Sequence, residues 1–414
     1  MSLNETPSGE RAHIGFFGAS NAGKSSLVNA VTGQDLSVVS DVPGTTTDPV
    51  RKAMELLPLG PVIVIDTPGL DDPDPALGEQ RVKRARQVLA QCDLAVLVTD
   101  ASTGRAGLSG FDRELLALFE ERGLPYIIAR NKADLLAPGG GLRTRPPLSD
   151  NDICVSALTG EGVHELKERL AALAPKREGE KRLVADLLSP GDAVVLVVPI
   201  DKAAPKGRLI LPQQQTIRDI LDAGCMALVC RDEELTDALA RLAVRPRLVV
   251  TDSQVFGRVA RDLPEDQPLT SFSILFARYK GDLPALVRGA AALSRLQDGD
   301  RALISEGCTH HRQCGDIGTV KMPAWIKKHS GANPEFAFTS GGEFPGPDEL
   351  SSYALIVHCG GCMLNEREMQ DRLARAGAAG VPVVNYGVAI AKMNGILRRS
   401  LEPFPEVRGL LDAQ

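Results

Sequence analysis

Short apolar runs alternate with helix-length amphipathic segments along most of the chain. In the first third, runs rich in β-branched residues are separated by segments such as 25–32 and 112–122, which have the length and apolar spacing of helices. Strands that alternate with helices in this way form a mostly parallel sheet with helices on both faces. The strands expected here are 13–18, 61–66, 93–100 and 125–132.

The same alternation continues through two further pieces of the chain. Polar stretches at 175–182 and 262–270 separate these pieces and are typical of linkers. The sequence therefore predicts an α/β fold, in which an N-terminal domain with a parallel sheet (1–174) precedes two smaller α/β domains (183–262 and 270–414). The strands expected in the smaller domains are 194–200, 226–230, 247–251, 302–305, 336–340, 354–358 and 381–385.

Composition narrows the class of protein. Of the 414 residues, 43% are hydrophobic and 24% are charged, which is typical of a globular chain and excludes a disordered or fibrous one. The longest apolar run, 193–198, is far short of the ~20 residues that span a bilayer. The N-terminal residues contain no hydrophobic signal core, so we expect a cytoplasmic location. The net charge of −6 gives no reason to expect a nucleic-acid partner.

The segment GASNAGKS (18–25) matches the phosphate-binding loop pattern G-x-x-x-x-G-K-[ST]. It lies between a predicted strand and a predicted helix, where backbone N–H groups and the helix N-terminus favour phosphate. In this pattern Lys24 neutralises the β- and γ-phosphates and Ser25 binds Mg²⁺. DTPG (66–69) ends the next apolar run, which places Asp66 near the Mg²⁺ and the Gly69 N–H near the γ-phosphate.

Later segments indicate which base is bound. NKAD (131–134) and Ser156-Ala157 follow two further apolar runs and resemble the guanine-reading motifs of translation-factor-related GTPases. PGTTTDP (43–49) resembles the first switch of that superfamily, with Thr46 as the expected Mg²⁺ ligand and two threonines beside it. We therefore expect GTP and Mg²⁺, with Lys24, Thr46 and Gly69 as catalytic residues. The residues expected at the nucleotide are Gly18, Asn21, Ala22, Gly23, Lys24, Ser25, Ser26, Asp66, Asn131, Lys132, Asp134, Ser156 and Ala157.

Two positions refine the expected hydrolysis. Leu70 follows DTPG, where Ras-like GTPases have the glutamine that positions water, so hydrolysis should be slow. Asn21 lies in G-x-x-N-x-G-K-S, which resembles potassium-stimulated GTPases of the tRNA-modification type. That resemblance implies a K⁺ ion held against the phosphates.

Cysteine and histidine gather in the last third of the chain. Eight cysteines are too few for a disulfide scaffold, and Cys92, Cys154, Cys225 and Cys230 read as buried thiols. Cys308 and the segment HCGGC (358–362) each follow an apolar run, and strand ends of one parallel sheet share an edge. Cys308, Cys359 and Cys362 suit either zinc, with His310 or His358 as fourth ligand, or an iron–sulfur cluster with three cysteines.

CTHH (308–311) and HCGGC after a complete set of GTPase motifs resemble the HydF family of FeFe-hydrogenase maturation GTPases. Segments 204–213 and 316–323 are also similar to that family, and the resemblance covers essentially the whole chain. It implies a scaffold whose 4Fe–4S cluster is held by Cys308, Cys359 and Cys362.

The resemblance also implies partners and cargo. A HydF protein receives a di-iron precursor cluster from the radical-SAM maturases HydE and HydG, delivers it to the apo-hydrogenase HydA, and forms a homodimer through its middle domain. Some relatives offer a glutamate seven residues after the first cysteine, where this chain has Gly315. His310, Cys314, Asp316 and His358 are therefore the candidate fourth ligands of the cluster.

Two other classes of function compete with this reading. A tRNA-modification or ribosome-associated GTPase with a zinc-binding C-terminal domain would have a basic surface, which the net charge does not support. A redox or hydrolytic enzyme using His310 or His358 as acid–base lacks any Ser–His–Asp pattern or paired carboxylates in the sequence.

Overall fold

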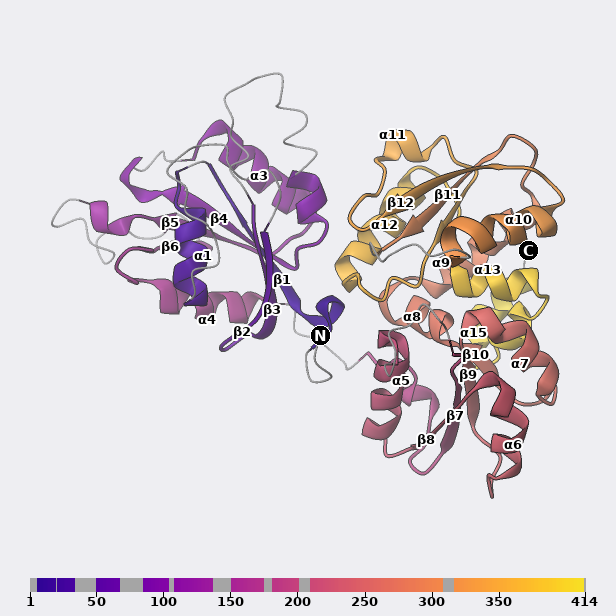
Figure 1. Cartoon of the computed structure of the whole chain (residues 1–414). Coiled ribbons are helices and arrows are strands. Elements are labelled where there is room, and N and C mark those ends of the chain that lie inside the picture. Colours follow the sequence, from indigo (N-terminus) through magenta and orange to yellow (C-terminus); the bar gives the residue numbers. More distant parts are fainter. Residues whose placement is uncertain are drawn as a thin grey trace. The chain divides into compact units, whose positions relative to one another are not determined.

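The computed structural model describes residues 6–19, 21–33, 50–67, 85–103, 108–136, 150–174, 181–200, 209–307 and 316–412. They belong to two compact units, Met1–Glu178 with one β-sheet and Gly179–Gln414 with two (Figure 1). Several predicted site residues lie outside the described residues, namely Thr46, Gly69, Leu70, Cys308, His310 and Cys314.

The first unit contains a six-stranded sheet in the order β2-β3-β1-β4-β5-β6. All neighbouring strands are parallel except β2 and β3, which are antiparallel. The strands are β1 (Ala12–Phe17), β2 (Val50–Leu56), β3 (Gly60–Asp66), β4 (Leu94–Asp100), β5 (Tyr126–Asn131) and β6 (Asp152–Cys154), and the helices are α1 (Lys24–Thr32), α3 (Gly110–Glu121) and α4 (Val163–Leu173).

Both faces of this sheet are buried, because successive strand residues point to opposite sides. On one face, Phe16 of β1 packs with Leu27 of α1 and Leu166 of α4. On the other, Phe17 of β1 packs with Phe119 of α3. The near-continuous apolar runs of the sequence are the consequence of this double coverage.

The second unit contains two four-stranded sheets, in the orders β10-β9-β7-β8 and β12-β11-β13-β14, and every pair of neighbouring strands is parallel. The strands are β7 (Ala193–Val197), β8 (Met226–Cys230), β9 (Leu248–Thr251), β10 (Leu269–Ser271), β11 (Arg301–Glu306), β12 (Glu335–Ser340), β13 (Leu355–His358) and β14 (Val383–Asn385). The helices are α5 (Leu211–Asp222), α6 (Leu235–Ala240), α7 (Phe256–Asp262), α8 (Phe272–Lys280), α9 (Leu283–Gly289), α10 (Met322–Ser330), α11 (Pro347–Leu350), α12 (Glu366–Ala378), α13 (Tyr386–Met393), α14 (Leu397–Ser400) and α15 (Pro405–Arg408).

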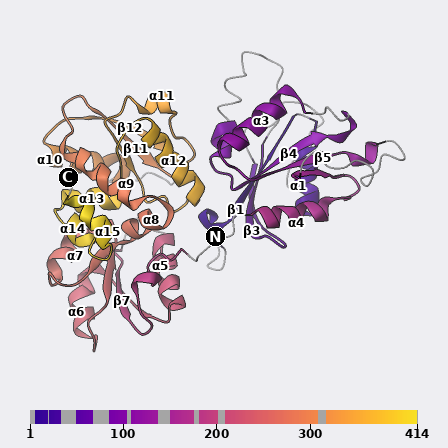
Figure 2. The same ribbon diagram turned by 180° about the vertical axis from the view of Figure 1, so that it is seen from behind.

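One apolar core joins the two sheets of the second unit. It includes Val195 of the first sheet, Ile304 and Val357 of the second, and Leu275 of α8. Seen from the front and from behind, α8 and α13 lie between the two sheets (Figure 2). The second sheet therefore shares its core with residues from the middle of the chain.

The expected fold class is confirmed: a parallel-sheet N-terminal unit precedes further α/β structure. The stretch 262–270, read as a linker, ends in β10, which pairs with β9 in the first sheet of the second unit. Residues on both sides of this stretch share one core, and the three-part division stays a prediction. No helix among the described ranges is long and apolar enough to cross a bilayer.

Candidate functional site

The loop between β1 and α1 has backbone that requires glycine at two positions. Gly18 has φ +138°, and a Cβ there would lie 2.1 Å from the carbonyl oxygen of Val98. Gly23 has φ +85°, and a Cβ there would lie 2.3 Å from Nδ2 of Asn131. Asn21 also has positive φ, 63°, which asparagine tolerates better than most residues. The sequence pattern thus corresponds to a loop that packs tightly against two neighbouring strands.

Lys24 and Ser25 begin α1 directly after this loop. The Lys24 side chain is buried, and its ammonium donates to the carbonyl oxygens of Gly18 (2.8 Å) and Ala19 (2.7 Å), which holds it over the loop. The Ser25 hydroxyl donates to Oδ2 of Asp66 at 2.8 Å. Two oxygens suited to Mg²⁺ are therefore adjacent, one from the helix and one from the end of β3.

Asn131 connects the phosphate-binding loop to the segment that contains Ala157, which the sequence predicts to read the base. Its Nδ2 donates to the carbonyl oxygens of Ala22 (3.0 Å) and Gly23 (3.3 Å), and its Oδ1 accepts from the backbone N–H of Ala157 (2.9 Å). The Ser156 hydroxyl donates to Oδ1 of Asp134 at 2.5 Å. Segments that are more than a hundred residues apart in the chain thus meet at the carboxyl edge of the sheet.

Asp100 is a residue of this site that the sequence reading missed. It ends β4, and its Oδ2 accepts a hydrogen bond from the Lys132 ammonium at 2.7 Å. Burial on its own would raise the pKa of Asp100, but hydrogen bonds from Lys132 and Ser102 bring it below the usual value. Its place at the end of an apolar run was the available signal. Asp100 orients Lys132, whose backbone has φ 64°.

The second candidate site lies where β11 and β13 end side by side. The Cys359 N–H donates to the carbonyl oxygen of Ser305 at 2.9 Å, which extends the pairing of the two strands. The Sγ of Cys359 accepts N–H donors from Gly307 (3.1 Å) and Gly361 (3.4 Å). Two backbone N–H donors are thus aimed at one sulfur.

The two residues that donate to this sulfur, Gly307 and Gly361, occupy positions that require glycine. A Cβ at Gly307 would lie 2.7 Å from the Leu364 side chain, and Gly361 has φ +63°. The turn between Cys359 and Cys362 is consequently close to the residue that precedes Cys308. Within the described part of the chain no group of three His, Cys, Asp or Glu side chains could hold a metal ion.

Cys362 is largely buried, and this burial raises the pKa of its thiol, which the nearby Lys280 ammonium opposes. The carbonyl oxygen of Cys362 accepts a hydrogen bond from Lys280 at 3.1 Å. Lys280 comes from α8, eighty-two residues earlier in the chain, and the sequence reading did not single it out.

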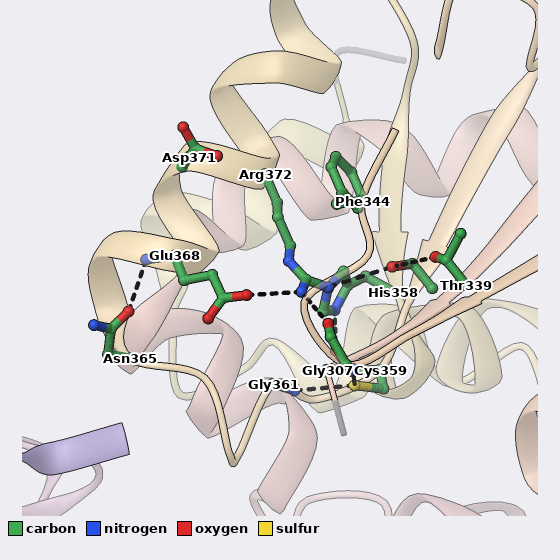
Figure 3. Close-up of polar contacts among 12 residues, drawn as sticks. Gly307, Thr339, Phe344, His358, Cys359, Gly361, Asn365, Glu368, Asp371 and Arg372 are labelled. Carbon is green, nitrogen blue, oxygen red and sulfur yellow. Dashed lines mark hydrogen bonds and ion pairs between the residues drawn. The ribbon is translucent and has the colours of Figure 1, made fainter. Parts of the chain in front are cut away.

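His358 has contacts at both ring nitrogens. Nδ1 lies 2.8 Å from the carbonyl oxygen of Cys359, and Nε2 lies 3.1 Å from Nη1 of Arg372 (Figure 3). Burial and then the Arg372 charge lower the pKa of His358 to about 3, so the ring is neutral near pH 7. Both nitrogens are thus engaged inside the second unit. A ligand role for His358 stays a prediction.

Arg372 lies at the centre of a buried polar group. From α12 it points between Glu368 and the ring of Phe344 towards His358 (Figure 3). Nη2 donates to Oε1 of Glu368 at 2.8 Å and to the carbonyl oxygen of Gly341. The sequence offered no signal for it, because a charged residue on an amphipathic helix reads as exposed.

Two carboxyl groups lie near the same edge. Asp316 caps the turn at 317–321, where its Oδ2 accepts from the N–H and the hydroxyl of Thr319 (2.9 and 3.1 Å). Glu306 is buried and accepts a hydrogen bond from the Tyr386 hydroxyl at 3.2 Å. Burial, then the charges of Glu306 and Cys359, raises the pKa of Tyr386 well above its usual value. Tyr386 therefore stays protonated and donates.

The phosphate-binding loop, Asp66, the segment 131–134 and Ser156-Ala157 meet at the carboxyl edge of the sheet. Together with the sheet topology, they define the first unit as a P-loop GTPase domain. Residues 13–132 match the family model described as 50S ribosome-binding GTPase. Residues 183–281 match the hydrogen maturase F dimerization domain, and 284–403 match the hydrogen maturase F tetramerization domain. These two matches together span just over half of the chain, which belongs to the hydrogen maturase F family. The HydF resemblance seen in the sequence is thereby confirmed.

Individual relatives match a smaller part of the chain. The chain is 37% identical over 162 residues to the tRNA modification GTPase MnmE of Xanthomonas oryzae pv. oryzae, and 35% identical over 162 residues to that of Methylococcus capsulatus. Each match covers 39% of this chain, which spans about a third (34%) of the length of those relatives.

The chain also has weak similarity to solved structures. The Aquifex aeolicus Era protein bound to GDP and AlF₄⁻ is 21% identical, with 60% of this chain and 97% of that chain covered and a TM-score of 0.35. NFeoB from S. thermophilus bound to GDP, AlF₄⁻ and K⁺ is 26% identical, with 39% and 62% covered and a TM-score of 0.30. With TM-scores this low, the fold assignment rests on the strand order and the family models instead.

Proposed function

We propose that this chain is a GTP-hydrolysing scaffold that binds a 4Fe–4S cluster through Cys308, Cys359 and Cys362. In this proposal it accepts a di-iron precursor from HydE and HydG and delivers it to the apo-hydrogenase HydA. The middle piece, 183–262, forms a homodimer, and 270–414 holds the cluster. Membership of the hydrogen maturase F family supports this role.

One contact carries the cluster assignment. The N–H of Gly307, directly before Cys308, donates to Sγ of Cys359 at 3.1 Å. Backbone donors to cysteine sulfur are a usual feature of iron–sulfur sites, where they tune the reduction potential. The donor set fits a thiolate-held cluster, because Cys359 and Cys362 share a glycine-rich turn beside the strand that leads to Cys308. A cluster held by three cysteines leaves one iron for a further ligand, which suits a carrier.

For the fourth ligand, we propose one of His310, Cys314, Asp316 and His358. Asp316 is at the N-terminus of a short helical turn, and its carboxylate is hydrogen-bonded to Thr319. His358 is bonded to Arg372 and Cys359.

In the GTPase domain, Lys24 neutralises phosphate charge, while Ser25 and Thr46 bind Mg²⁺ and Asp66 accepts from Ser25 in the Mg²⁺ shell. Gly69 donates its N–H to the γ-phosphate, and Asp134 accepts from guanine. We propose that Asn21 helps to hold K⁺ and that hydrolysis is slow, since Leu70 offers no group to position water. Nucleotide-dependent ordering of the switch segments then changes docking with the partners.

The test is anaerobic reconstitution of the full chain, followed by iron, sulfide and zinc analysis. We expect about four irons and four sulfides per chain and an EPR signal of the reduced cluster. Chains loaded with the precursor should then activate apo-hydrogenase. Cys92→Ser is the control variant and should bind iron and activate like wild type, because Cys92 lies in the core of the first unit. Stoichiometric zinc without iron would contradict the cluster assignment and favour the GTPase with a zinc-binding domain.

A further inference from the structure

Lys280 is a buried cation at the end of α8. Lys280 is only 3% exposed. Its ammonium donates to the carbonyl oxygens of Cys362 (3.1 Å) and Leu364 (2.9 Å). It also lies 5.6 Å from the centre of the Phe276 ring. Both carbonyl oxygens belong to the turn that carries Cys359 and Cys362.

Helix α8 is fixed near this turn by hydrogen bonds from neighbouring elements at both of its ends. At its start, Asn385 Nδ2 donates to the carbonyl oxygen of Ser273 at 2.9 Å, and a Cβ at Gly360 would lie 3.8 Å from the Ser273 hydroxyl. At its end, Gln370 Nε2 donates to the carbonyl oxygen of Lys280 at 3.2 Å. These contacts fix the helix that carries Lys280.

Helix α8 lies in the part of the chain that matches the dimerization model, whereas the cysteine turn lies in the part that matches the tetramerization model. Removing an ammonium from water has a large free-energy cost that is offset only by good hydrogen bonds or nearby negative charge. Here two hydrogen bonds to the cysteine turn, accepted by the carbonyl oxygens of Cys362 and Leu364, offset part of this cost.

We propose that Lys280 is a positioning residue of the cluster site: it holds the Cys359–Cys362 turn in the shape that binds the cluster and places a positive charge beside the thiolates. This inference rests on the proposed function. The dimerization segment thereby forms one wall of the cluster site, and its helix α8 determines the affinity and the potential of that site.

The experiment compares K280M, which removes donor and charge, with K280Q, which retains a donor without charge. K327M is the matched control, since the exposed Lys327 ammonium lies 5.9 Å from the Phe336 ring. In the iron-free full chain, hydrogen exchange of residues 359–364 should be at least about tenfold faster in K280M than in wild type. K280Q should be intermediate and K327M unchanged.

After anaerobic reconstitution, K280M should lose iron to a chelator about tenfold more readily than wild type. K280Q should have a lower cluster midpoint potential than K327M, because a negatively charged cluster is easier to reduce beside a cation. Wild-type exchange at 359–364 in both K280M and K280Q would overturn the proposal. If wild type itself binds no iron, the proposed function fails, while the exchange rates still decide the role of Lys280. If K280M does not fold, K280Q supplies the decisive exchange rate.

Discussion

The guanidinium of Arg372 donates to Nε2 of His358 over 3.1 Å, and both side chains are almost wholly buried. Because arginine has no acceptor and keeps all its protons, Nε2 must accept this hydrogen bond. The proton of the neutral ring is therefore on Nδ1, which donates to the carbonyl oxygen of Cys359 at 2.8 Å. A residue of α12 thus determines the tautomer of the histidine that precedes the cysteine turn.

Replacing Arg372 by alanine should destabilise the second unit strongly. It leaves the buried Glu368 carboxylate without its ion pair, and removing one member of a buried pair costs about 3–5 kcal/mol of unfolding free energy. Chemical denaturation of the iron-free chain measures this change. Arg375→Ala is the control, since Arg375 on the same helix also lies over Phe344 but its side chain is 22% exposed. Equal losses in the two variants would contradict a special role for Arg372.

Asp134→Asn should change the nucleotide preference from GTP towards xanthosine nucleotide, because an amide cannot accept both N–H groups of guanine. Affinity for GTP should fall by at least about tenfold, which calorimetry with each nucleotide measures. Ser156→Ala removes only the hydroxyl that donates to Asp134 and should retain the preference for GTP. Unchanged GTP affinity in Asp134→Asn would refute the guanine assignment.

Lys24→Ala should abolish GTP hydrolysis, with a loss of roughly a hundredfold or more in kcat, because the phosphate charge is no longer neutralised. Phosphate release by the purified chain measures this. Lys52→Ala is a suitable control, as Lys52 is an exposed residue of β2. Hydrolysis at the wild-type rate in Lys24→Ala would mean that the phosphates bind elsewhere.

Exchange of K⁺ for Na⁺ should slow GTP hydrolysis severalfold, and Asn21→Ala should remove most of that difference. Asn21 is exposed and has left-handed backbone, so solvent ions have access to this residue. The check is the hydrolysis rate in matched K⁺ and Na⁺ buffers. Equal rates in the two buffers with wild type would eliminate the role given to Asn21.

Serine at Cys308, Cys359 or Cys362 should abolish or severely deplete the 4Fe–4S signal, whereas Cys314→Ser should retain most of the iron. Cys359 and Cys362 lie on the turn after β13, and Cys308 follows Gly307 at the end of β11. Iron content and EPR of the four variants test this assignment. Complete cluster loss in Cys314→Ser with an intact signal in Cys308→Ser would reverse it.

Local features of the sequence predicted the GTPase domain. Gly18 and Gly23 mark backbone that no other residue fits, and Lys24 and Ser25 follow them at fixed spacing. The β2 strand was missed because it has no apolar run: Arg51, Lys52 and Glu55 are exposed charged residues within it. The strand β10 was missed because its three residues follow two prolines in a polar stretch.

The sequence alone determined features that depend on neighbours along the chain: the positions of most strands, the turns that require glycine and the motifs at the strand ends. The tertiary structure alone decided which distant groups meet. Lys280 reaches Cys362 and Arg372 reaches His358 because two sheets share one core and bring α8 and α12 to the same edge. Such contacts have no sequence signature, because a buried cation is specified by its three-dimensional partners, and on an amphipathic helix it is indistinguishable from an exposed one.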